Sequence, residues 1–445
     1  MVQQPLKLFR AMLRILLVSE HASSSFGGEA ALPLHYFRVL RRRGFAVWLV
    51  VHERTRGELE QLYPNDPNIH YVQDTWFHRM TYQLGRIMPA RVEYFTTGYA
   101  RRLSSQWAQK RLARRLVQER QIDVVHQPMP VSPREPSLMF GLGVPVVIGP
   151  MNGGIGYPPA FQRHQSRVID ALLAVGRLAS HGLNRLIPGK LESATLLVAN
   201  ERTRRALPPG TRGRVVELAE NGVDLGMWGN TCTAAQESSA TLTRFVFLGR
   251  LVDWKAVDLL LPAFRAAAAH APMSLTIVGD GPERARLEET CRSWGTLADD
   301  QALAGQVQFT GWRSQQECAD ILKQSSALVL PSLMECGGAV VLEAMAASRP
   351  VIATDWGGPS DYLDPSCGIL VPPSDRGRFE AGLTEAMVRL AQSPTLRERM
   401  GRAGYRKVAE RFDWEVKVDR ILEIYRDAVH AGAPGRSLQS AVEPG

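Results

Sequence analysis

Cysteine is scarce in this sequence. The 445 residues include five cysteines, an odd number scattered between Cys232 and Cys367. None of them forms a C-x-x-C pair, and no histidine cluster stands at the spacing of a zinc site. A disulfide-stapled framework is therefore excluded, and we expect no bound metal.

Long apolar runs are also missing. No stretch approaches the ~20 uncharged apolar residues that a membrane-spanning helix needs. Near the N-terminus, Lys7, Arg10 and Arg14 interrupt the apolar residues, and the apolar core and cleavage site of a secretory signal are lacking. We expect a cytoplasmic protein.

The glycine fingerprint of dinucleotide-binding proteins is incomplete. Gly279 and Gly281 supply the first two glycines of G-x-G-x-x-G, but Arg284 stands where the third is required. This argues against a nicotinamide-dependent dehydrogenase. The sequence also lacks a recognised nucleic-acid-binding motif, so we expect no nucleic-acid partner.

Positive charge, by contrast, is in excess. Lys and Arg number 53 against 44 Asp and Glu, a formal net charge of +9. Such a charge favours an anionic partner, which by itself covers nucleic acid, an acidic membrane face and phosphorylated ligands. The segments Thr75–Arg102 and Phe161–Lys190 mix arginines with aromatic or apolar residues. Both fit helices lying on an anionic membrane, and both equally fit ordinary helices that cover a sheet.

Short apolar, β-branched runs alternate with longer amphipathic stretches, which is the pattern of βαβ units around a parallel sheet. Two such series, together with a length beyond what one core supports, predict an α/β fold with two domains. The predicted strands are 14–19, 46–52, 123–126, 144–148 and 195–199 in the first series and 244–248, 274–278, 307–310, 327–331, 350–354 and 368–371 in the second.

The predicted domain boundaries follow the breaks in this rhythm. Residues 1–205 form the first domain, and 206–243, which contain a Pro-Pro-Gly turn and a polar stretch, form a linker region. Residues 244–410 form the second domain. An amphipathic helix over 411–430 follows, and we expect the tail 431–445 to be disordered.

One segment of the second domain is typical of a phosphate site. Residues 331–346 predict a strand, a glycine turn at Gly337 and Gly338, and then a helix. Glycines before a helix let backbone N–H groups approach an anion, and the helix N-terminus adds its positive dipole end. Glu335 precedes the helix and Glu343 lies about 7.5 Å along it, so the two acids flank the phosphate position. Carboxylates accept hydrogen bonds from hydroxyl groups, so one acid could bind a ribose and the other a sugar. A nucleotide-sugar carries both groups. Two surface acids without a joint role are the alternative.

Two cations follow an earlier strand of the same series. Arg250 and Lys255 stand in the loop after the strand 244–248, at the sheet edge where ligands bind in open α/β folds. They are suited to neutralise a diphosphate: the planar guanidinium of Arg250 can donate two parallel hydrogen bonds, and the ammonium group of Lys255 acts as a compact charge. An Arg and a Lys at this spacing are also common on solvated surfaces.

Taken together, these motifs resemble the retaining glycosyltransferases of the group 1 (GT4) type, whose members include bacterial mannosyltransferases and sucrose-phosphate synthases. The resemblance covers roughly 244–373 and rests on order and spacing. Its residues are Gly249-Arg250…Lys255, Val278-Gly279-Asp280-Gly281-Pro282, Phe309-Thr310-Gly311, Pro331-Ser332, the E-x7-E pair Glu335 and Glu343, and Pro350-Val351-Ile352-Ala353. The first half resembles the family more weakly, through Gly27-Gly28, Asp123-Val124-Val125-His126, Ala199–Thr203 and Glu220–Asp224.

The resemblance implies a GT-B architecture, in which two facing Rossmann-like domains bind donor and acceptor and the C-terminal helix crosses back to the first. It implies retention at the anomeric carbon, with Arg250, Lys255 and Glu335 as catalytic residues. It requires no metal or cofactor beyond a nucleoside-diphosphate sugar, in keeping with the lack of a D-x-D loop. The implied donor contacts are Gly27, Gly28, Gly249, Gly337, Gly338, Val341, Leu342 and Glu343.

The chain departs from the family pattern after the strand 144–148. A histidine is usual there, whereas this sequence has Gly149-Pro150-Met151-Asn152-Gly153-Gly154. Asn152 and Gly153 are candidate substitutes for the sugar or acceptor contact. His126 is a further candidate, with a packed residue at a strand end as its alternative.

The sequence thus predicts transfer of a hexosyl unit from a nucleoside-diphosphate sugar to a hydroxyl of a glycan, lipid-linked or small-molecule acceptor. Synthesis of a glycolipid, a lipid-linked glycan or an exopolysaccharide is the expected context, with peripheral contact to the cytoplasmic membrane face. A glycosidase also uses two carboxylates but has no need of the cations. A nucleotide-sugar epimerase and a non-enzymatic basic membrane-binding protein remain as alternatives. The donor base and sugar are not encoded in these motifs.

Overall fold

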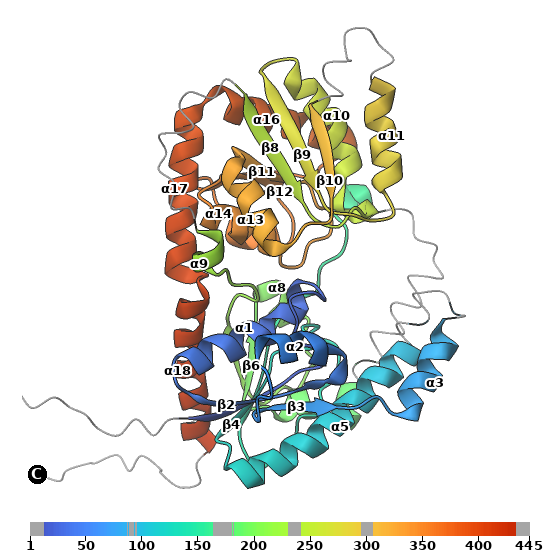
Figure 1. Cartoon of the computed structure of the whole chain (residues 1–445), viewed down its shortest axis with the longest axis vertical. Coiled ribbons are helices and arrows are strands. Elements are labelled where there is room, and N and C mark those ends of the chain that lie inside the picture. The colour runs from blue at the N-terminus through green and yellow to red at the C-terminus, as the bar shows by residue number, and fades with distance from the viewer. Residues whose placement is uncertain are drawn as a thin grey trace, which may run out of the picture. The chain divides into compact units, whose positions relative to one another are not determined.

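The computed structural model describes residues 13–86, 88, 93, 96–162, 180, 182–229, 242–294 and 306–432. Contacts divide the chain into two units. The first comprises 1–153, 172–220 and 418–445, and the second comprises 154–171 and 221–417. Each unit is built on a parallel sheet with helices on its faces (Figure 1).

The first unit contains a seven-stranded sheet in the order β3-β2-β1-β4-β5-β6-β7. All of its neighbouring strands run parallel. The strands are β1 (Arg14–Val18), β2 (Ala46–His52), β3 (Ile69–Val72), β4 (Val124–Gln127), β5 (Val146–Met151), β6 (Thr195–Val198) and β7 (Arg214–Glu217). The helices are α1 (Gly28–Arg42), η1 (Glu53–Thr55), α2 (Arg56–Leu62), α3 (Trp76–Gly85), α5 (Thr97–Arg120), α7 (Gly189–Glu192) and α8 (Glu201–Arg205).

The second unit contains a six-stranded sheet in the order β10-β9-β8-β11-β12-β13, again with parallel neighbours. The strands are β8 (Thr243–Leu248), β9 (Met273–Val278), β10 (Val307–Gly311), β11 (Ala327–Leu330), β12 (Val351–Thr354) and β13 (Gly368–Val371). The helices are η2 (Pro159–Phe161), α9 (Leu225–Trp228), η4 (Asp253–Lys255), α10 (Val257–Ala268), α11 (Arg284–Trp294), α13 (Gln315–Gln324), α14 (Ala339–Ala346), α15 (Gly358–Tyr362), α16 (Arg376–Gln392) and α17 (Pro394–Arg411).

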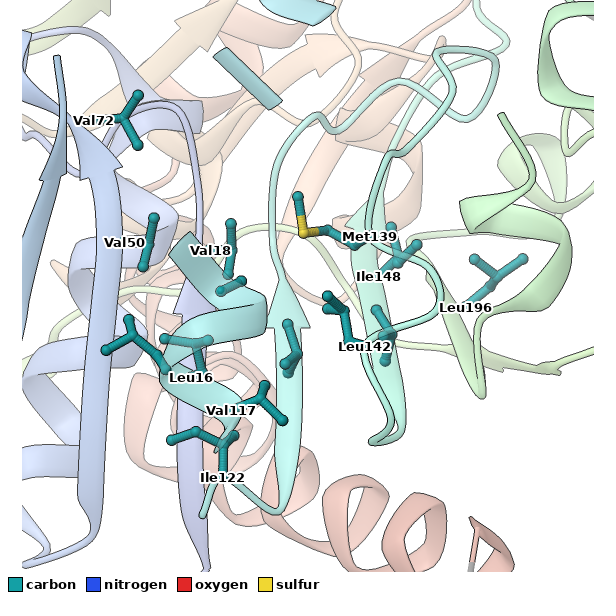
Figure 2. Packing of buried hydrophobic residues seen from close by; sticks show 14 of the residues in the cluster. Leu16, Val18, Val50, Val72, Val117, Ile122, Met139, Leu142, Ile148 and Leu196 are labelled. Atoms are coloured by element: carbon teal, nitrogen blue, oxygen red, sulfur yellow. The ribbon is translucent and has the colours of Figure 1, made fainter. Parts of the chain in front are cut away.

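Alternate residues of the first sheet build its core. Leu16 and Val18 of β1 lie on one face with Val50 of β2, and Ile148 of β5 and Leu196 of β6 continue the same row (Figure 2). This two-residue period is what a strand imposes, because successive side chains point to opposite faces. Helix α5 covers the face with the buried residues Ala113, Leu116 and Val117. The strands are apolar on both faces, as expected where helices cover both sides of a parallel sheet.

The predicted strands are confirmed, and two further ones are present. Strands β3 and β7 lie at the two edges of the first sheet, where burial is incomplete and no continuous apolar run marks them. Because β7 joins the first sheet, 206–220 belong to the first unit and are not a linker. Residues 230–241 of the predicted linker lie outside the described residues.

The C-terminal helix α18 (Trp414–Gly432) begins three residues later and ends two residues later than predicted, so residues 431 and 432 of the predicted disordered tail are helical. The chain returns to the first unit at Val418, as the crossover predicted. Within that unit, Arg43 pairs with Asp419 and Arg214 with Asp427. The remainder of the predicted disordered tail, 433–445, lies outside the described residues, as do 163–179 of the basic segment.

Candidate functional site

Two loops meet at the carboxyl edge of the second sheet. Strands β8 and β11 are neighbours although they are not consecutive, so the strand order reverses between them. Ligands of open α/β sheets bind at such a switch point. The loop after β8 carries Gly249, Arg250 and Lys255, and the loop after β11 runs from Pro331 to Gly338. The Leu333 amide donates to the Trp254 carbonyl at 2.8 Å, which joins the two loops.

Gly279 and Gly281, the two glycines of the incomplete fingerprint, pack closely against the loop after β8. A Cβ on Gly279, whose φ is +135°, would stand 1.9 Å from the Gly249 carbonyl oxygen. A Cβ on Gly281 would stand 2.2 Å from the Leu251 carbonyl oxygen. These glycines therefore allow the loop after β9 to pack beneath the loop after β8, a structural role that needs no dinucleotide.

Helix α14 begins at the second loop in a form suited to an anion. Gly338 is its N-cap with φ of +76°, in the left-handed region that favours glycine. The first amides of a helix have no carbonyl four residues earlier to bond within it, although the Val341 amide donates to the Gly338 carbonyl at 3.0 Å. The helix dipole adds positive charge at this end. Beneath this turn, the Gly358 amide donates to the Glu335 carbonyl at 2.8 Å, which fixes the backbone of the loop.

Lys255 and Glu335 come together as an ion pair, a contact that sequence spacing did not reveal. Both side chains are largely buried. Arg250 is exposed, and among the described residues it has no hydrogen-bond or ion-pair partner. Among the described residues, the loop after β8 thus carries one guanidinium without a partner and one ammonium group that is already paired with a carboxylate.

Glu343 faces a different environment. Its side chain is partly buried on α14, and burial raises the pKa of its carboxyl group to about 7. No described residue donates a hydrogen bond to it or pairs with it. Cys318 of α13 lies near enough that the charge of Glu343, after burial, helps to raise the pKa of that thiol to about 11. A buried carboxylate without donors is costly unless a ligand supplies them.

Val341 and Leu342 lie in the core of the second unit. Both side chains are fully buried, and the Val341 amide donates to the Gly338 carbonyl. They therefore build α14 and offer no side-chain surface to a donor.

Gly27 and Gly28 lie at the carboxyl edge of the first sheet, where α1 begins. Gly27 is the N-cap of α1 with φ of +103°, and a Cβ on either residue would meet nothing within 4 Å. The backbone is therefore open to close approach.

His126 is fully buried, in agreement with the packed alternative. Its Nε2 donates to the Gly149 carbonyl at 2.6 Å, and its Nδ1 accepts from the Tyr425 hydroxyl at 2.6 Å. Burial lowers its pKa to about 4. With both nitrogens engaged, it offers no atom for a sugar contact.

Asn152 and Gly153 belong to an internal hydrogen-bond network of the first unit. Asn152 is buried, and its amide donates to Glu220 at 2.8 Å. The Gly153 amide donates to the Thr203 hydroxyl at 3.1 Å, and Asn200 donates to Asn152 at 3.3 Å. Asn200 and Glu220, which belong to two of the family-like motifs, are thus both bonded to Asn152. Gly153 is only partly accessible.

One group in the first unit has the residue types of a metal site. Ligand atoms of His52, Asp74 and His78 lie within 4.8 Å of one another. Arg54 donates to Asp74 at 2.9 Å, and both ring nitrogens of His78 are hydrogen-bonded, to Thr75 and to Ser105. A guanidinium beside the carboxylate disfavours a cation there, so we assign the group no metal.

The sequence match to a known protein family falls within the second unit. Residues 243–393 match the family described as glycosyl transferases group 1. The D-inositol 3-phosphate glycosyltransferase of Saccharomonospora viridis is 31% identical over 236 residues, which cover 51% of this chain and 53% of that protein. The chain thus spans about half the length of the curated relatives it matches.

Solved structures resemble nearly the whole chain. HepE of Anabaena in complex with UDP aligns with a TM-score of 0.62 and 15% identity, over 93% of this chain and 100% of that chain. Sucrose-phosphate synthase from Thermosynechococcus elongatus aligns with a TM-score of 0.60 and 18% identity, over 94% and 100%. The predicted fold, two Rossmann-like units of the GT-B kind, is confirmed.

Proposed function

Because residues 243–393 carry the sequence pattern of the group 1 glycosyl transferases on a GT-B fold, we propose that this protein is a retaining glycosyltransferase. It transfers a hexosyl unit from a nucleoside-diphosphate sugar to a hydroxyl acceptor. The reaction uses no metal and no cofactor besides that co-substrate. Glycolipid, lipid-linked glycan or exopolysaccharide synthesis is the proposed context.

The arrangement around α14 carries this proposal. An anion-binding helix start stands between Glu335 and Glu343, and the latter carboxylate has no donor among the described residues. A nucleotide-sugar supplies a diphosphate for the helix start, sugar hydroxyls for Glu335 and a ribose diol for Glu343. The UDP in the HepE structure agrees with a donor of this class.

Arg250, Lys255 and the α14 amides act on the leaving group. The bond between the anomeric carbon and the diphosphate oxygen breaks, and negative charge grows on that oxygen. Preorganised cations and N–H groups stabilise this charge more in the transition state than in the ground state. The acceptor oxygen attacks from the face that the diphosphate leaves, and its proton passes to the departing oxygen. Configuration is thereby retained.

Nucleotide and sugar screening tests this assignment. We expect uridine, guanosine or adenosine diphosphate, alone or as its sugar, to raise the melting temperature, since a ligand of the folded state stabilises it. With donor and acceptor, the chain should release nucleoside diphosphate at an undiminished rate in EDTA. Anomeric analysis of the product by NMR should show retention. Donor isomerisation without any acceptor would identify an epimerase instead.

Two variants separate binding from chemistry. Lys255→Ala should lower kcat, because its contact strengthens as charge develops. Glu343→Ala should chiefly weaken donor binding, because ribose contacts persist from ground state to transition state. Unchanged kinetics in both variants would contradict the site.

Peripheral membrane contact is a second part of the proposal, and helix α3 supports it. Its inner face buries His78, Thr81 and Gly85. Trp76, Met80 and Leu84, four residues apart, leave 69%, 45% and 45% of their surfaces exposed. Apolar side chains on a solvent face, with Arg79 between Trp76 and Met80, suit the interface of an anionic bilayer. No helix in the described part of the chain is long and apolar enough to span a membrane.

Vesicle sedimentation tests the membrane contact. The chain should pellet with anionic vesicles and remain in solution with neutral ones. Trp76→Ser should reduce the pelleted fraction severalfold, whereas Trp312→Ser, which alters an exposed indole of the second unit, should not. Equal partitioning into both kinds of vesicle contradicts an electrostatic surface.

A further inference from the structure

A segment from the first half of the sequence packs on the second unit. Residues 154–162, here called the strap, follow β5 and group with the second sheet. Trp356 Nε1 donates to the Gly156 carbonyl at 2.8 Å. Ile155 covers Gly357 so closely that a Cβ there would lie 2.3 Å from its Cδ1. The Phe161 ring meets Phe379 edge to face at 5.8 Å.

The strap and the loop after β8 enclose a pocket of about 790 Å³. This volume lies in the range of small-molecule sites, roughly 300–1,000 Å³. Three aromatic residues line it, Tyr157 and Phe161 from the strap and Trp254 from the loop. Arg250 completes the wall toward the donor site.

The charges around the pocket balance. Three arginines and three acids line it. Two of the arginines are already paired, since Arg286 bonds Glu283 and Arg376 contacts Asp258. Asp253 accepts from the Trp254 amide at 2.8 Å. Arg250 has no ion-pair partner among the residues that the structure describes. A phosphate or another polyanion would require net positive charge, so the pocket fits a neutral ligand that offers hydrogen-bond groups.

Aromatic side chains and hydrogen-bonding charged groups together suit a carbohydrate. The apolar C–H faces of a pyranose pack on aromatic rings, and its hydroxyls bond to carboxylates and guanidinium groups. Trp254 lines this pocket and directly precedes Lys255, the partner of Glu335, on one short turn. A saccharide held here therefore lies next to the position proposed for the donor diphosphate.

We propose that this pocket binds a neutral saccharide, the non-anionic glycan portion of the acceptor, with Tyr157, Phe161 and Trp254 as its platforms. That this saccharide is the acceptor depends on the proposed transferase function, whereas saccharide binding is inferred from the pocket alone.

Saturation-transfer NMR on the full chain tests the proposal with maltose, cellobiose and lactose as probes, and with glucose 1-phosphate as the anionic comparison. Each probe is measured with and without saturating UDP. At least one neutral disaccharide should bind more tightly than glucose 1-phosphate. Phe161→Ala and Tyr157→Ala should each weaken that binding about tenfold, while the UDP-induced thermal shift is retained. Trp107→Ala, which removes an exposed indole of the first unit, is the matched control.

The outcomes separate the two proposals. Absence of binding by all three disaccharides overturns the pocket assignment, as does a preference for glucose 1-phosphate or unaltered binding in both strap variants. A retained thermal shift shows that a strap variant remains folded around its donor site. If no nucleoside diphosphate binds and a disaccharide still does, the transferase function fails while the saccharide site stands.

Discussion

At the residue scale, Glu343 is the side chain whose chemistry the structure defines most clearly. Its carboxyl group is buried without a donor among the described residues, and its pKa is raised to about 7. Since an unfolded glutamate titrates near 4.3, its contribution to stability is full below that pH and is lost as the pH rises through 7. Ionised Glu343 is therefore costly in the folded protein, and hydrogen bonds from the proposed ribose diol would lower that cost.

Glu343→Gln should therefore stabilise the ligand-free protein at pH 8 by up to about 3–4 kcal/mol, because the difference between a pKa of ~4.3 in the unfolded state and about 7 in the folded state corresponds to that free energy. At pH 4 the two proteins should unfold alike. Urea unfolding at both pH values measures the difference. Glu289→Gln, at an exposed position, should shift neither value, and equal effects at pH 4 and pH 8 would contradict the burial argument.

His126, in contrast to Glu343, is a buried polar residue whose two ring nitrogens both form hydrogen bonds within the first unit. Tyr425→Phe would leave its buried Nδ1 without a donor, which costs about 1–3 kcal/mol. Urea unfolding should report this loss, and Tyr405→Phe on α17 serves as the control. Because the folded pKa of about 4 lies below the unfolded value, stability should also decline as the pH falls from about 6.5 to about 4.

At the scale of elements, the loop between β1 and α1 is held by one carboxylate from α2. Glu58 accepts from the Ser23 hydroxyl, from the Ser24 amide at 2.8 Å and from the Ser25 hydroxyl at 3.1 Å. Burial opposes its ionised form, but these bonds outweigh burial and hold its pKa below the usual value. The loop leads directly to Gly27, so Glu58 positions the glycine pair.

Glu58→Gln should loosen this loop at a cost of about 1 kcal/mol, since hydrogen bonds to a charged acceptor are replaced by weaker ones. Amide exchange at 22–28 should accelerate, and kcat should fall more than donor binding. Glu60→Gln, on the same helix, should leave exchange in that loop unchanged. Unaltered exchange in Glu58→Gln would show that the serines hold the loop without it.

At the scale of the whole molecule, the chain forms two units, each with its own sheet and buried core. It passes between them at Gly153–Gly154, once between residues 162 and 180, at Glu220–Asn221 and at Lys417–Val418. The second unit holds the proposed nucleotide site. Two units with separate cores are not required to unfold in one step.

Calorimetry should resolve two transitions, of which UDP shifts the one that belongs to the second unit. At a hundred times its Kd, a ligand adds about 2.7 kcal/mol to the unit that binds it. Glu343→Ala, the variant expected to weaken nucleotide binding, should reduce that shift and leave the other transition in place. A single transition that moves as a whole with nucleotide would contradict independent cores.

The sequence by itself determined the features that depend on local pattern. Short runs of apolar residues, either alternating or uninterrupted, predicted the buried strands. Such runs occur because helices cover both faces of these strands. The glycine turn before α14 and the spacing from Glu335 to Glu343 could be predicted because all of these residues lie in one short, continuous segment.

Only the tertiary structure decided contacts between segments far apart in the chain. Lys255 pairs with Glu335, which is 80 positions away, and His126 bonds to Tyr425, which is 299 positions away. Tyr157 and Phe161 of the strap line one pocket with Trp254, about 95 positions later. Edge strands β3 and β7 escaped detection for a related reason, since their place in the sheet comes from a neighbour and not from their own apolar content. Local sequence fixes which surface a segment buries, whereas the partner of that surface is set by how the whole chain packs.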